Sequence, residues 1–191
     1  PARTATELME ERMTGTAALE IVIDLEDDYA FQDPVRLNAV EQLVRETSAL
    51  NHREAKVEKT LSLLDVIKET NKALNANQPE AYQIPESRSL ISQELLLFES
   101  NGRNDLEALT DATYSVARIT MMLNWIDAIH YRSFIEDIKT IALRYFEPSE
   151  VTVTGRVEVS SLVASLLLIS MSESYVLALL LIVPLMMLIL K

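Results

Sequence analysis

Apolar and polar residues follow two different periods over the first 156 residues, and these periods predict alternating strands and helices. From Ala18 to Asp24 every second residue is apolar, so Leu19, Ile21 and Ile23 are expected on one buried face of a strand. Three more segments are expected to form strands because they combine apolar residues with turn residues at their ends. They are 55–59, 113–123 and 151–154.

Apolar residues three and four positions apart predict helices between these strands. The expected helices are 34–50, 62–74, 87–99 and 126–146, after the end of another helix over 5–13. Asp33 and Pro34 suit the first turn of a helix, and Ser62 with Asp65 has the spacing of a capping box. Asn101-Gly102 is expected to end the helix that begins at 87.

Each main helix has an apolar stripe that is expected to face the core. The stripe of the helix over 34–50 is Leu37, Val40, Val44 and Leu50. The stripe of the helix over 87–99 is Ile91, Leu95 and Phe98. The helix over 126–146 is the most amphipathic, with a stripe of Tyr131, Phe134, Ile138, Ile141, Ala142 and Tyr145.

The order of elements predicts an α+β domain over 1–156. Strand, helix and strand occur twice, with a helical insertion at about 60–99 between the two halves. Two βαβ units of this kind are typical of the ferredoxin-like sandwich, in which helices cover one face of an antiparallel sheet. We therefore expect one four-stranded sheet, with the helices over 34–50 and 126–146 side by side on one face.

The segment 157–191 is expected to enter and cross a membrane. The run 175–190 has no charged residue and spans about 24 Å as a helix, and adding the apolar run 162–171 makes one longer helix. Pro184 is tolerated in such a helix as a kink. The alternative is a buried helix of a soluble protein, but no other element is apolar enough to cover such a helix on all sides.

The residues that flank the apolar run predict its orientation. Tyr175 suits an interface, and we expect Glu173 near the outer interface and Lys191 at the inner one. A functional carboxylate within the membrane is the alternative interpretation of Glu173, and a solvated residue where the helix enters the membrane is the preferred one. Residues 1 to about 173 are then extracytoplasmic, and the membrane is the cell (inner) membrane.

The chain is acidic and contains no cysteine. Its formal net charge is −12, which disfavours nucleic acids and anionic lipid surfaces as partners. An acidic domain beside a membrane segment suits the outer side, since Lys and Arg are retained inside. The first residue is Pro1 and the last is Lys191, directly after an apolar run, so we expect a segment of a longer protein. The first 13 residues do not have the apolar core of a signal peptide.

The sequence offers no enzyme site, so we expect neither catalysis nor a cofactor. His52 and His130 do not have a second ligand at metal spacing and are interpreted as surface residues, so no metal is expected. A glycine-rich phosphate loop, a Gly-x-Ser-x-Gly elbow and a catalytic cysteine are absent from the sequence. The acidic residues of 24–28 are candidate Ca²⁺ ligands, but they do not have EF-hand spacing and are better interpreted as a solvated loop.

Large apolar side chains gather where the strand over 113–123 meets the next helix. They are Met121, Met122, Leu123 and Trp125. Methionine and aromatic side chains adapt to varied apolar ligands, which makes the four residues candidates for a substrate cleft. Met121 and Leu123 share one face of the strand and Met122 takes the other, so only some of them can face a cleft. Ordinary core at the boundary of an element is the alternative.

Several segments in order resemble exporters of the resistance-nodulation-division (RND) superfamily, in their MMPL-like, hydrophobe/amphiphile branch. The segments similar to the first porter-domain loop of that family are Gly15-Thr16, 19–24, Asp33-Pro34, 57–65 with Lys68 and Asn71, 82–85 and 93–97. Val153-Thr154-Gly155 and the following helix are similar to the junction with the second transmembrane helix.

The resemblance implies a part of a proton-driven exporter of lipids or other apolar compounds. Its partners would be the lipid bilayer, the remaining domains of the full-length transporter and an apolar substrate. In this family the proton-relay carboxylates lie in other membrane helices, so no coupling residue is assigned to this chain. The alternative function is an extracytoplasmic sensor domain of a membrane receptor, in which an α+β domain also leads into a membrane helix.

Overall fold

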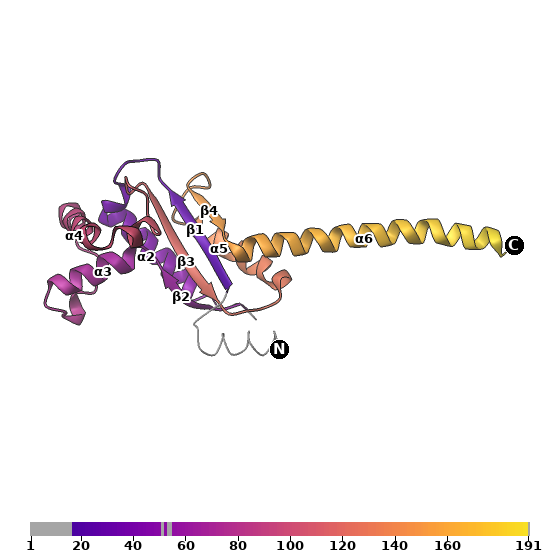
Figure 1. Cartoon of the computed structure of the whole chain (residues 1–191), viewed down its shortest axis with the longest axis horizontal. Coiled ribbons are helices and arrows are strands. Elements are labelled where there is room, and N and C mark those ends of the chain that lie inside the picture. The colour runs from indigo at the N-terminus through magenta and orange to yellow at the C-terminus, as the bar shows by residue number, and fades with distance from the viewer. Residues whose placement is uncertain (1–16, 51, 53–54, 191) are drawn as a thin grey trace.

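The computed structural model describes residues 17–50, 52 and 55–190, so the helix expected over 5–13 lies outside the described residues. Four strands and five α-helices are present in this part of the chain. A compact α+β part is followed by one long helix that projects away from it (Figure 1). The prediction of an α+β fold is confirmed.

The four predicted strands form a single antiparallel sheet with the order β2-β3-β1-β4. The strands are β1 (Ala17–Asp24), β2 (Val57–Leu61), β3 (Val116–Leu123) and β4 (Val151–Thr154). Ile21 of β1 lies opposite Ile119 of β3 and Val153 of β4, so these three side chains share one face. The alternating pattern predicted this face correctly, because Leu19, Ile21 and Ile23 are all fully buried.

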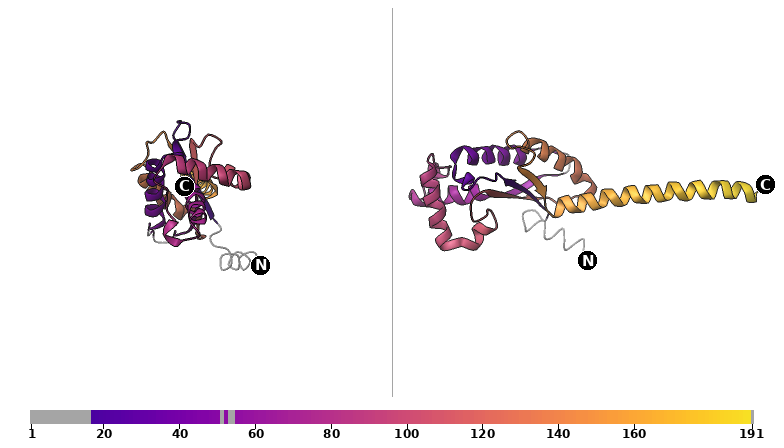
Figure 2. Two further views of the ribbon diagram at one scale, coloured as in Figure 1. Left: turned by 90° about the vertical axis from the view of Figure 1, so that its left-hand side faces the viewer. Right: turned by 90° about the horizontal axis from the view of Figure 1, so that it is seen from above.

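Two helices cover the buried face of the sheet and lie next to each other, as predicted (Figure 2). They are α2 (Pro34–Ser48) and α5 (Tyr131–Ala142). Their C-terminal ends are joined by Glu46, which accepts a hydrogen bond of 2.6 Å from the Tyr145 hydroxyl and pairs with Arg144 at 3.0 Å. Asp33 caps α2 by accepting a 2.8 Å hydrogen bond from the Val35 N–H.

The two helices differ from the prediction in detail. α5 begins at Tyr131, after the short 3₁₀ helix η3 (Ala128–His130), and not at 126. The core side of α2 includes Leu43, which the predicted stripe omitted, while Val44 is only partly buried. Because the two positions are adjacent, the stripe is rotated by about 100° at this turn relative to the prediction.

The helical insertion consists of α3 (Leu63–Leu74) and α4 (Arg88–Glu107), and it lies at the end of the sheet away from the long helix (Figure 1). Asp65 accepts a 2.8 Å hydrogen bond from the Ser62 N–H at the start of α3, as a capping box requires. The prediction that Asn101-Gly102 ends α4 is wrong, because α4 continues to Glu107. Glycine inside a helix costs only about 1 kcal/mol, and buried Leu106 anchors the last turn.

Asp111 shortens the next strand, so β3 begins at Val116 and not at 113. Its Oδ1 atom accepts hydrogen bonds from the N–H groups of Ser115 and Val116, at 2.8 Å and 2.9 Å. Its Oδ2 atom accepts hydrogen bonds from the Thr113 N–H at 3.1 Å and from the Thr113 hydroxyl. A carboxylate that binds this many backbone donors holds residues 111–115 in a turn.

Replacing Asp111 by asparagine is expected to destabilise the domain by about 2 kcal/mol near neutral pH. Burial alone would raise the pKa of Asp111, but the hydrogen bonds to its charged form lower the pKa to about 2. The pKa is thus lowered on folding, so this stability is present above about pH 4 and is lost as the pH falls towards 2. Urea unfolding of the unmodified chain and of Asp111→Asn at pH 7 and pH 3 measures the loss of stability and its pH dependence. An equal loss of stability at the two pH values would contradict the lowered pKa of Asp111.

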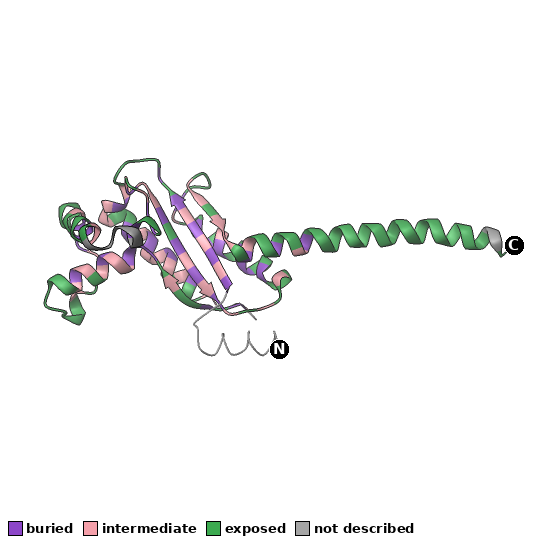
Figure 3. Ribbon diagram, in the orientation of Figure 1, coloured by how far each residue is buried: buried purple, intermediate pink, exposed green. Residues whose placement is uncertain are grey.

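The C-terminal helix α6 (Arg156–Ile189) leaves the domain directly after Gly155. Its first turns pack on α5 and β1 and bury Val157, Ser161 and Ser165, whereas the described side chains from Leu166 onward are exposed (Figure 3). The stretch Arg156–Met187 is long and apolar enough to cross a membrane, and none of its most apolar window is buried. The described residues of this chain therefore do not bury this part of α6.

Candidate functional site

The four predicted cleft residues lie in different surroundings. Met121 and Leu123 are on the sheet face beneath the helices and are 0% exposed. They are core residues, and their assignment to a cleft is corrected because α2 and α5 cover that face. Met122 lies on the opposite face and is partly buried, and Trp125 is 57% exposed just beyond the end of β3. The candidates are thereby reduced to Met122 and Trp125.

The backbone around Trp125 is held by hydrogen bonds on both sides. The Tyr131 hydroxyl donates to the Asn124 carbonyl at 2.6 Å and accepts from the Ile126 N–H at 3.1 Å. The Asn124 side chain accepts a 2.6 Å hydrogen bond from the Lys56 N–H, next to the start of β2. Trp125 thus sits on a well-anchored connection, although its side chain is mostly exposed.

A small hollow lies beside Trp125, between the connection from β3 to α5 and the first turns of α6. Its volume is about 100 Å³. It is lined by Ala17, Trp125, Ile126, Ala128, Tyr131, Arg156, Val157 and Ser160. Arg156 is the one charged side chain in this lining, and Met122 does not contribute to it.

The hollow suits contact with part of an apolar molecule. Pockets that enclose a drug-sized ligand have volumes of about 300–1,000 Å³, so this one accepts only a short apolar segment. Trp125 provides a flat apolar surface at its mouth, which holds apolar ligands without fixing one orientation. An open contact surface of this kind fits passage of a ligand better than its enclosure.

The other groups considered for chemistry lie elsewhere. His52 Nε2 is 3.1 Å from the Ser133 hydroxyl, and the His52 ring packs edge-on against Phe134, while His130 is exposed. The acidic residues of 24–28 are exposed at the end of β1 and in the loop that follows it. In the part of the chain that the structure describes, no three His, Asp or Glu side chains are grouped so as to hold a metal ion.

The sequence interpretation missed the second wall of the hollow, which α6 provides. Arg156, Val157 and Ser160 are about thirty residues from Trp125 in the chain. They reach it because β4 pairs with β1, whose first residue Ala17 lies at the same end of the sheet. The break at Gly155, between a strand and an apolar helix, was the signal that a helix begins there.

Comparisons of this chain with protein-family models, with curated proteins and with solved structures find no match.

Proposed function

We propose that the chain is a porter-type domain of a membrane exporter, carried outside the cell membrane on the transmembrane helix α6. The observation that carries this proposal is the continuity of α6 with the sheet domain. An exposed helix of this length and apolarity, which starts directly after an edge strand, is costly in water and is stabilised by a bilayer. The resemblance to RND exporters over the same segments agrees with this arrangement.

The strand order supports a ferredoxin-like arrangement for the domain. In that sandwich the first and third strands are central and antiparallel, with the fourth and second strands at the edges. The order β2-β3-β1-β4 and the placement of α2 and α5 on one face agree with it. We interpret α3 and α4 as an insertion between its two βαβ halves.

The proposed membrane segment is the C-terminal half of α6. Tyr175 marks the outer interface, with Glu173 just outside it, and Pro184 lies inside the bilayer. The domain is extracytoplasmic in this orientation, and its acidic character agrees with the outer side. The remaining domains of the full-length protein supply the proton-driven step, because this chain contains none of the relay helices of that family.

We propose that Trp125 contacts an apolar or lipid-like substrate as it passes between domains. Replacing Trp125 by alanine in the full-length transporter is expected to reduce export at least several-fold while the amount of folded protein stays near normal. The side chain is largely exposed, so its loss removes little core packing. Export of a fluorescent lipid analogue and the yield of folded protein are measured together.

A matched control separates this role from a general effect of losing an exposed apolar side chain. Leu143 is also exposed, and it lies just beyond the end of α5, away from the hollow. Leu143→Ala is expected to leave export unchanged. If Trp125→Ala lowers folded protein and export in the same proportion, Trp125 is a structural residue and the proposed contact is wrong.

A further inference from the structure

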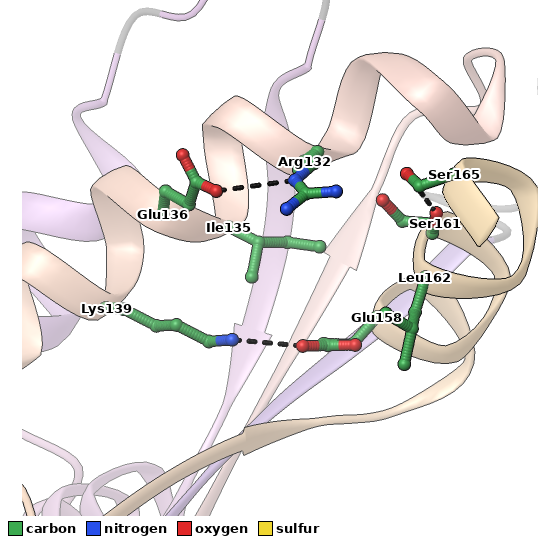
Figure 4. Close-up of a pocket in the computed structure, with 8 residues that line it drawn as sticks. All are labelled: Arg132, Ile135, Glu136, Lys139, Glu158, Ser161, Leu162 and Ser165. Carbon is green, nitrogen blue, oxygen red and sulfur yellow. Dashed lines mark hydrogen bonds and ion pairs between the residues drawn. The ribbon is translucent and has the colours of Figure 1, made fainter. Parts of the chain in front are cut away.

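A second hollow, larger than the one beside Trp125, lies between α5 and α6 (Figure 4). Its volume is about 210 Å³. Leu162 and Ser165 line it, whereas Arg156 and Ser160 line the Trp125 hollow. The two linings have no residue in common. The second hollow is therefore separate from the proposed substrate contact.

The rim of this hollow has two positive and two negative side chains. Lys139 Nζ is 3.0 Å from Glu158 Oε1, and Arg132 Nε is 3.5 Å from Glu136 Oε1. Arg132 and Glu136 are both largely exposed, and exposed ion pairs contribute at most about 1 kcal/mol. The rim has no net charge, and its weak Arg132–Glu136 pair is easily exchanged for contacts with a ligand.

Polar atoms that face the hollow retain capacity for hydrogen bonds. Ser161 is only 3% exposed, and its hydrogen bond with the Ser165 hydroxyl uses its backbone carbonyl and not its own hydroxyl. Figure 4 shows this hydroxyl pointing across the hollow towards α5, on the side where Arg132 lies. The terminal guanidinium nitrogens of Arg132 also have no hydrogen-bond partner among the described residues, and one of them points towards α6 (Figure 4). A guanidinium and a hydroxyl that face each other form a recognition site for phosphate oxygens.

The carboxylates of Glu136 and Glu158 can bind a positively charged group of the same ligand. Glu136 and Glu158 each use only Oε1 in an ion pair, so the second oxygen of each remains available. Each of these oxygens can accept a hydrogen bond from a primary ammonium group. A ligand that has a phosphate and an ammonium group a few atoms apart matches both halves and leaves the rim neutral.

An apolar track continues from the hollow along α6. Buried Ile135 and half-exposed Leu162 both form part of the hollow's lining. Leu166 and Ile169 follow Leu162 on the same side of the helix, and all three are about half exposed. At about 1.5 Å per residue, the distance from Leu162 to Tyr175 is about 20 Å, so the track leads to the proposed outer interface.

We propose that this hollow binds the zwitterionic phosphoethanolamine headgroup of a membrane lipid, whose alkyl chain lies along Leu162, Leu166 and Ile169. Arg132 and Ser161 bind the phosphate, and Glu136 and Glu158 bind the ammonium. The proposal rests on the membrane attachment of α6, which gives lipids access to the track. It concerns a site that is separate from the export path at Trp125.

The test uses the whole chain in neutral maltoside micelles, titrated with lyso-phosphatidylethanolamine and observed by native mass spectrometry. The expected result is binding about tenfold tighter than that of lyso-phosphatidylglycerol with the same acyl chain, because the latter has no ammonium group. Arg132→Gln is expected to weaken binding of the ethanolamine lipid about tenfold, and Ser161→Ala about threefold. Arg144→Gln is the control, because Arg144 is an exposed arginine that pairs with Glu46 outside the hollow.

Three results would overturn the proposal. Equal binding of both lipids would refute the recognition of the ammonium group. Unchanged binding to Arg132→Gln and Ser161→Ala would show that the lipid adheres only to the apolar surface of α6. Displacement of the lipid by an equal concentration of free phosphoethanolamine would identify a headgroup site without a role for the track. None of these measurements involves transport. The exporter proposal can therefore be wrong while the lipid site is correct, and the lipid site can be wrong while the exporter proposal is correct.

Discussion

Replacing Gly155 by alanine is expected to destabilise the domain by about 3 kcal/mol, the largest loss that we predict for a single methyl group in this chain. Gly155 has φ 106° and ψ 177°, a backbone conformation that is adopted almost only by glycine. A Cβ atom at this position would lie 3.1 Å from the Ala18 carbonyl oxygen and 3.1 Å from the Glu20 nitrogen. Both are backbone atoms of the central strand β1, so they cannot move aside as a flexible side chain can.

The measurement is urea unfolding of the chain in a mild detergent, followed by the fluorescence of Trp125, the single tryptophan. Gly102→Ala is a matched control, since Gly102 lies within α4, where alanine is favoured over glycine by up to about 1 kcal/mol. The same chemical change is thus expected to have opposite signs at the two positions. Similar unfolding midpoints for the two variants would contradict the assigned conformation of Gly155.

Replacing Glu94 by glutamine is expected to remove most of the pH dependence of stability between pH 5 and pH 8. Glu94 is 1% exposed on the core side of α4, and neither carboxylate oxygen has a hydrogen-bond partner within the described part of the chain. Burial raises the pKa of Glu94 from 4.5 to about 7. The charged form is therefore disfavoured in the folded domain.

The sign of the effect follows from the protons bound in each state. The folded domain holds the Glu94 proton up to about pH 7, whereas the unfolded chain releases it near pH 4.5. The contribution of Glu94 to stability is therefore greatest below about pH 4.5 and falls as the pH rises to 7, by an amount on the order of 3 kcal/mol. Urea unfolding at pH 5, 6, 7 and 8 measures this slope in the unmodified chain and in Glu94→Gln.

An exposed glutamate on the same helix provides the comparison. Glu107→Gln removes the same charge from the last residue of α4 and is expected to leave the slope unchanged. At pH 8 the Glu94→Gln variant is expected to be more stable than the unmodified chain. A slope that survives in Glu94→Gln would mean that another group controls the pH dependence.

The elements best predicted from the sequence are those whose ends are marked by proline, glycine or a capping residue. β4 has the predicted bounds because Pro148 precedes it and Gly155 follows it, and the start of α2 is set by Asp33 and Pro34. β1 was predicted to within one residue, since an apolar residue at every second position from Leu19 to Ile23 predicts a strand with one buried face. For these elements the residues next to each end were sufficient to predict the bounds.

Errors arose where tertiary contacts decided the outcome. α4 continues through Asn101-Gly102 because buried Leu106 anchors its last turn, and that burial is not visible in the local pattern. Asp111 delays the start of β3 because its carboxylate accepts hydrogen bonds from Thr113, Ser115 and Val116. Glu94 occupies a core position three residues after Ile91, and a charge on an apolar stripe was a signal that the sequence interpretation did not use.

The candidate site was predictable only in part. Trp125 was identified from its residue type and its place after a strand, but its exposure depends on how the connection to α5 is anchored. Alternation correctly separated Met122 from Met121 and Leu123, but it did not show which face the helices cover. Both hollows use the first turns of α6, whose position is fixed by the pairing of β4 with β1.

The most direct test of the central claim is the accessibility of single cysteines in intact cells. The chain has no cysteine of its own, so Ser149→Cys and Leu180→Cys each introduce one reporter, in the exposed loop before β4 and in the proposed membrane span. With a membrane-impermeant maleimide, Ser149→Cys is expected to react without cell lysis, whereas Leu180→Cys is expected to react only after denaturation. If Leu180→Cys reacts as readily as Ser149→Cys, or if Ser149→Cys reacts only after lysis, an extracytoplasmic domain on a membrane-spanning α6 is contradicted.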